Sequence, residues 1–137
     1  MNGPFVDPVP AGGIGTVLAR ELAEAQCAFL FGSAETPAFS RESDVDVAVL
    51  FSSPLGLAVR SALKASLETA LGRDVDLVDL RGADPILAFQ VLRHGRPIIV
   101  RDRKAYAEFV MRTLSEYADL KLDRRPAERA LRREAAP

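Results

Sequence analysis

The stretch Asp44-Val45-Asp46-Val47-Ala48-Val49-Leu50-Phe51 decides the fold of this chain. Its β-branched residues and its initial alternation of acidic and apolar residues are typical of a β-strand. Alternate side chains of a strand share a face, so Asp44 and Asp46 should point the same way, with Cα atoms roughly 6–7 Å apart. The opposite face is wholly apolar and should lie in the core: Val45, Val47, Val49 and Phe51.

Two carboxylates at that separation repel each other unless a cation lies between them. Hard divalent cations with oxygen ligands provide a reason for such a pair. Residues 74–80 (DVDLVDL) carry three more aspartates, of which Asp74 and Asp76 share a face while Asp79 faces away. If the two strands are neighbours, one of these aspartates can join the first pair. Three carboxylates around two cations suit in-line displacement at phosphorus.

Periodicity along the rest of the chain predicts four strands and four helices. Short apolar segments predict the strands at 27–31, 44–51, 75–80 and 97–100, the last at a sheet edge because a proline leads it. Helical spacing of apolar residues predicts the helices at 13–26, 52–71, 86–94 and 106–120. This order predicts an α/β (α+β) fold, in which helices pack on a mixed sheet of about four strands.

Capping residues suggest where the predicted helices begin and end. Ser52-Ser53-Pro54 resembles a helix start, and Asp84 followed by Pro85 predicts another. Gly95 should end the helix that Asp84 begins. In the last turn of that helix, Arg93 and His94 would interact favourably with the helix dipole.

Length and composition indicate one globular domain. The chain has 137 residues, 48% hydrophobic and 27% charged, which excludes a largely disordered chain. We expect an irregular lead-in at 1–12, the domain at 13–122 and a basic polar tail at 123–137. No apolar run approaches the length of a membrane span, and the N-terminal residues lack the features of a signal peptide. Cys27 is the single cysteine and cannot form an internal disulfide, so a cytoplasmic location is expected.

The net charge of −1 conceals an asymmetry between the two ends of the chain. Residues 1–92 carry 6 basic and 12 acidic side chains, whereas residues 93–137 carry 12 basic and 7 acidic ones. A basic C-terminal third could contact nucleic acid, a nucleotide or an acidic partner, or it could be a solvated helical face.

The spacing Gly32-Ser33, nine residues, Ser43-Asp44-Val45-Asp46, followed by a strand with a further aspartate, resembles the DNA polymerase β-like nucleotidyltransferase superfamily. At this length it is most similar to the minimal (MNT) type, found as antitoxins beside HEPN-domain toxins. The resemblance implies that Asp44, Asp46 and Asp76 are catalytic and bind two Mg²⁺ ions. It also implies that the nucleotide-binding residues are Gly32, Ser33 and Ser43. Where the family often has an Arg-Gly segment after Gly-Ser, this chain has Ala34-Glu35-Thr36-Pro37.

The resemblance implies transfer of AMP from ATP to a tyrosine of a cognate HEPN RNase toxin, which silences the toxin. Direct binding of nucleic acid or membrane is not expected. Two alternatives remain open at this point. The chain could be a non-catalytic antitoxin that neutralises its partner by contact, or a nucleotidyltransferase that acts on a small molecule.

Overall fold

The computed structural model describes residues 13–31 and 44–135, with side chains described as far as residue 122. The strands are β1 (Cys27–Phe31), β2 (Val45–Leu50), β3 (Val75–Asp79) and β4 (Arg96–Val100). The helices are α1 (Gly13–Glu21), α2 (Leu57–Leu71), α3 (Pro85–His94) and α4 (Arg103–Ala135). The strands form one sheet in the order β3-β2-β1-β4, with β2 and β3 parallel and the other two pairs antiparallel. The predicted fold class is confirmed, and β4 lies at an edge as its proline suggested.

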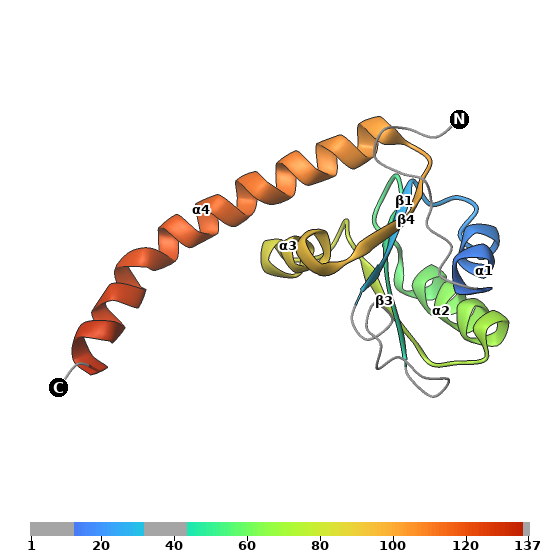
Figure 1. Ribbon diagram of the computed structural model, residues 1–137, viewed down its shortest axis with the longest axis horizontal. Helices are drawn as coiled ribbons and strands as arrows, with labels where there is room; N and C mark the ends of the chain where they lie inside the picture. Colours follow the sequence, from blue (N-terminus) through green and yellow to red (C-terminus); the bar gives the residue numbers. More distant parts are fainter. Residues whose placement is uncertain (1–12, 32–43, 136–137) are drawn as a thin grey trace.

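The sheet separates two hydrophobic clusters. One cluster, with α1 and α2, contains the predicted apolar face of β2, and Val45, Val47 and Val49 are fully buried there. The other, with α3 and α4, contains Ala48 and Leu50 from the opposite face of the same strand. Figure 1 shows α1 and α2 on one side of the sheet and α3 on the other. The central strand is therefore buried on both faces, except at its N-terminal end where the aspartates lie.

Helix α1 ends at Glu21, five residues before the predicted end at Gln26. The reason lies far away in the sequence, at the end of β4. The Arg101 guanidinium donates hydrogen bonds to the backbone carbonyls of Ala19, Leu22 and Ala25. The last carbonyl groups of a helix have no partner within the helix. Arg101 supplies donors to them, alongside the Ala25 N–H that also donates to the Leu22 carbonyl, and so stabilises an early end followed by a turn.

Helix α2 begins at Leu57, so the prediction of a start at Ser52-Ser53-Pro54 is wrong. Gly56 is the N-cap residue and provides no side-chain cap. The segment before it is held instead by the sheet, because the Leu55 N–H donates to Asp79 Oδ2 at 2.9 Å. Leu55 also packs against the hydrophobic cluster beneath α2.

Two side chains of α2 protect the outer edge of β3. The Val75 N–H donates to Glu68 Oε2 at 3.0 Å, and Arg60 Nη2 donates to the Leu77 carbonyl at 2.7 Å. These backbone groups alternate with the ones that pair with β2. The edge is thus occupied by groups from its own chain, which disfavours pairing with a foreign strand.

Helix α3 follows its predicted cap, because Asp84 Oδ1 accepts a hydrogen bond from the Leu87 N–H at 2.9 Å. Helix α4 packs on α3 through Phe89 and Tyr117, whose rings stack with centroids 3.9 Å apart. The helix continues to Ala135, beyond the end at residue 120 that its apolar spacing predicted. Its C-terminal part extends well beyond the body of the domain (Figure 1).

Candidate active site

Asp46 and Asp76 are direct register partners on the parallel strands β2 and β3. Neighbouring strands lie about 4.8 Å apart, so the side chains of the two residues project from the sheet side by side. On its other side Asp46 pairs with Phe31, the last residue of β1. The neighbourhood predicted from the sequence therefore exists, and the register places Asp76 opposite Asp46.

The carboxylates of this pair lie on the α3 and α4 side of the sheet. Asp46 alternates with Ala48 and Leu50, which belong to the cluster on that side, and Asp76 alternates with Val78, which packs against it. Asp46 is half-buried, whereas Asp44 and Asp76 are exposed. The acidic positions thus form the solvent-accessible end of an otherwise apolar face.

The acidic positions are neighbours in the sheet, but their carboxylates do not surround a common point. Among the side chains that the structure describes, in residues 13–31 and 44–122, no three His, Cys, Asp or Glu are close enough together to hold a metal ion. The donors themselves, three carboxylates, are the oxygen ligands that Mg²⁺ prefers. The chemistry of the donor set therefore fits a hard divalent cation, while the grouping of ligands around one is not present in the structure.

Asp79 has a structural role, in agreement with its predicted opposite orientation. It is only 7% exposed, and its carboxylate accepts hydrogen bonds from the backbone N–H groups of Leu55 and Arg81, at 2.9 and 3.1 Å. It fixes the turn after β3 to the segment before α2. The three predicted nucleotide-binding residues (Gly32, Ser33 and Ser43) lie outside the described residues.

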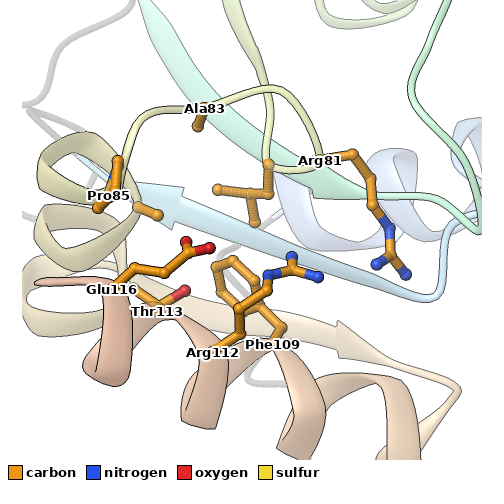
Figure 2. Close-up of a pocket in the computed structure, with 9 residues that line it drawn as sticks. Arg81, Ala83, Pro85, Phe109, Arg112, Thr113 and Glu116 are labelled. Atoms are coloured by element: carbon orange, nitrogen blue, oxygen red, sulfur yellow. The ribbon is translucent and has the colours of Figure 1, made fainter. Parts of the chain in front are cut away.

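A pocket of about 270 Å³ lies at the other end of β3, between the turn after that strand, α3 and α4. Figure 2 shows Arg112 and Glu116 of α4 beside it, opposite Ala83 and Pro85. Its walls also include Thr113, which is 2% exposed. No sequence motif indicated this pocket, because its lining comes from segments about 30 residues apart. It lies beyond the opposite end of the strand from Asp76 and is not part of the acidic site.

Cys27 has no catalytic environment. The pKa of its thiol is raised from the usual 9.0 to about 12, mainly by burial and also by the charge of Asp102, against a lowering by Arg81. The neighbouring polar groups are engaged with one another, since Arg81 Nη2 donates to Gln26 Oε1 at 2.9 Å. The thiol is therefore kept neutral in the core, as expected for a structural cysteine.

The sequence matches the family of polymerase β nucleotidyltransferases over residues 14–104. A curated relative, the protein adenylyltransferase MntA of Shewanella oneidensis, is 36% identical over 110 residues, which cover 79% of this chain and 77% of that protein. None of the described helices has both the length and the apolar character that a membrane span requires.

Solved structures of toxin–antitoxin complexes also contain chains that are similar to this one. A toxin–antitoxin structure with AMP-PNP contains a chain that is 32% identical, with a TM-score of 0.73 and coverage of 90% of this chain and 98% of that one. A second structure holds a tri-AMPylated HEPN toxin of Shewanella oneidensis in complex with its MNT antitoxin. There the identity is 30%, the TM-score 0.68 and the coverage 88% and 94%.

Proposed function

The chain belongs to the polymerase β-like nucleotidyltransferase family, and on that premise we propose that it transfers AMP from ATP to a tyrosine hydroxyl of a cognate HEPN-domain toxin. The observation that carries the proposal is the register pairing of Asp46 with Asp76 at an accessible sheet end. The likeness to a named protein adenylyltransferase and to an antitoxin bound to an AMPylated toxin supports the choice of nucleotide and acceptor.

In this reaction the tyrosine oxygen forms a bond to the α-phosphorus of ATP, and the bond from that phosphorus to the β-phosphate oxygen breaks. The products are the AMP ester of tyrosine and pyrophosphate. The proton of the attacking hydroxyl must leave during the step, and the exposed carboxylate of Asp76 is the group that would accept it. The half-buried Asp46 would keep its place because the strands on both sides fix its backbone.

Asp44, Asp46 and Asp76 are the residues that would hold Mg²⁺. Bound there, the cation would neutralise charge on the reacting phosphates and on the leaving pyrophosphate. Without it, the pair of carboxylates that face each other across β2 and β3 would repel both each other and the polyphosphate.

A labelling experiment tests the proposal directly. The purified chain is incubated with Mg²⁺, the cognate HEPN-domain protein and ATP labelled at either the α- or the γ-phosphate. Adenylyl transfer puts the α-label on the partner and releases the γ-label as pyrophosphate. Label from the γ-position on the partner would instead indicate a kinase.

One observation favours the alternative of neutralisation by contact. The described carboxylates do not gather into a metal site by themselves. If the partner is neutralised in a nuclease assay without nucleotide, and no α-label is transferred, the chain acts by binding. Loss of neutralisation when ATP is omitted, or when Mg²⁺ is chelated, would support catalysis.

A further inference from the structure

We propose that Arg93 and His94, the last two residues of α3, bind the β- and γ-phosphates of the nucleotide. The inference rests on the proposed function, since it concerns the leaving-group side of that same site. It assigns a role in substrate binding to two cationic side chains for which the sequence suggested only an interaction with the helix dipole.

The first step of the argument is position. Helix α3 packs through Ala88 and Val91 on the same side of the sheet as Asp46 and Asp76. Helix α3 starts shortly after the end of β3, and β4 follows it directly. Because β4 begins beside the end of β1, with Arg96 paired to Leu30, the helix must run back along the sheet to that end. The C-terminal turn of α3 therefore lies at the acidic end of the sheet.

The second step is close contact between this turn and β1. A Cβ atom placed on Gly95 would lie 3.3 Å from the Leu30 carbonyl oxygen and 3.4 Å from Phe31 Cβ. Phe31 is the register partner of Asp46 and directly precedes Gly32-Ser33. The turn that contains Arg93 and His94 thus lies on the β1 side of Asp46, whereas Asp76 lies on the opposite side of that residue.

The third step is charge. Arg93 and His94 are both exposed, and neither forms an ion pair within the described part of the chain. Their turn lies at the end of the sheet that carries the carboxylates and at the negative end of a helix dipole, so a polyphosphate entering this region needs additional positive charge. Arginine offers several N–H donors to phosphate oxygens, and histidine offers at least one in either protonation state. The segment after Ser33, Ala34-Glu35-Thr36-Pro37, supplies no cation.

Equilibrium binding of two nucleotides tests the assignment independently of catalysis. The double variant Arg93→Ala/His94→Ala should bind AMP-PNP with Mg²⁺ about tenfold more weakly than the unmodified chain, because it loses charge-assisted hydrogen bonds of about 1.5 kcal/mol or more. Its affinity for AMP should not change, since AMP lacks the phosphates concerned. Calorimetric titration measures the dissociation constants of both AMP-PNP and AMP.

Two matched variants complete the design. Arg112→Ala also removes an exposed arginine, but from the pocket beside Pro85, at the opposite end of α3, and should leave both affinities unchanged. Arg93→Lys/His94→Lys retains positive charge and should restore most of the AMP-PNP affinity. If the double alanine variant has a lower melting temperature but unchanged AMP-PNP affinity, the residues serve only the helix dipole and the proposal is overturned. An equal loss of AMP and AMP-PNP affinity would also overturn it.

The same variants separate this inference from the proposed function. In the transfer assay with the HEPN-domain protein, the double alanine variant should raise the KM for ATP far more than it lowers kcat. Absence of transfer by the unmodified chain would refute the proposed function, and the binding constants would still decide whether the turn holds phosphate.

Discussion

Asp46 of β2 and Asp76 of β3 face each other across a parallel strand pair, although 30 positions separate them in the sequence. Like charges directly opposite each other destabilise a sheet, so the repulsion within this pair opposes folding. The register that creates it is fixed by the buried valine face of β2, since a shift by one residue would turn the valines to the other side of the sheet and bring Asp46 into the core beneath α1 and α2. The structure therefore holds both carboxylates in place without the help of a cation.

Replacing the first acidic pair should separate activity from stability. We expect Asp44→Asn/Asp46→Asn to lower AMP transfer by about 100-fold or more, because the proposed metal ligands are lost while the fold is retained. Without Mg²⁺ the variant should be as stable as the unmodified chain or up to about 1 kcal/mol more stable, since repulsion is relieved. Initial transfer rates measure the activity, and urea denaturation measures the free energy of unfolding. Transfer at the original rate would contradict the assignment of this site.

Asp76 and Asp79 should respond in opposite ways to alanine substitution. Asp76→Ala should abolish most transfer with little effect on stability, because its side chain is exposed at the proposed site. Asp79→Ala should lower stability by about 1–3 kcal/mol, because it leaves two partly buried backbone N–H groups without their acceptor. The folded fraction of Asp79→Ala should retain its specific activity. Similar losses of kcat in both variants would show that the face assignment is incorrect.

Gly95 should not tolerate alanine. A Cβ atom there would lie 2.5 Å from the Val91 carbonyl oxygen, a backbone atom that cannot rotate away as a flexible side chain could. The helix end or β1 must move, at a cost of about 1–3 kcal/mol. Gly13→Ala is the matched control, because nothing lies within 4 Å of its added Cβ. Thermal denaturation should show a clear loss for the first variant and none for the second, and equal melting temperatures would exclude the steric conflict.

The thiol of Cys27 should be unreactive in the native protein. Its pKa of about 12 keeps it protonated at pH 8, whereas an exposed thiol with a pKa of 9.0 is partly ionised there. A disulfide reagent should modify it only after denaturation. Because the pKa is raised in the folded state, the unfolded chain loses its proton first, and this group lowers stability as the pH rises above about 9. Rapid native labelling at pH 8 would contradict the burial.

The basic end of the chain should assist association with the toxin. Truncation after Leu122 removes five arginines and three acidic residues, which lowers the net charge by two. We expect weaker binding to the HEPN-domain protein and a smaller dependence of the association rate on salt, because long-range attraction is reduced. Binding of Mg²⁺ and ATP should not change. Identical association rates and salt slopes in a surface-binding assay would indicate that this segment is only a solvated helix.

Much of the site follows from the sequence alone, because its signals are local. Period-two alternation is sufficient to place Asp44 and Asp46 on one face of a strand and the valines on the other. The cap at Asp84 is equally local, since it involves a backbone N–H only three residues away. The spacing of Gly32-Ser33 and the aspartates is sufficient to indicate the family.

The tertiary structure alone decided the features that depend on contacts between distant segments. Alternation left Asp74 and Asp76 equivalent, and only the alignment of β2 with β3 put Asp76 opposite Asp46. The end of α1 depends on Arg101, about 80 residues away, and the start of α2 follows the hydrogen bond from Leu55 to Asp79. The position of the α3 C-terminal turn beside β1 likewise depends on contacts between segments that are distant in the sequence. Hydrogen-bond partners of this kind satisfy backbone groups whichever part of the chain supplies the partner, so no local pattern of residues predicts such contacts.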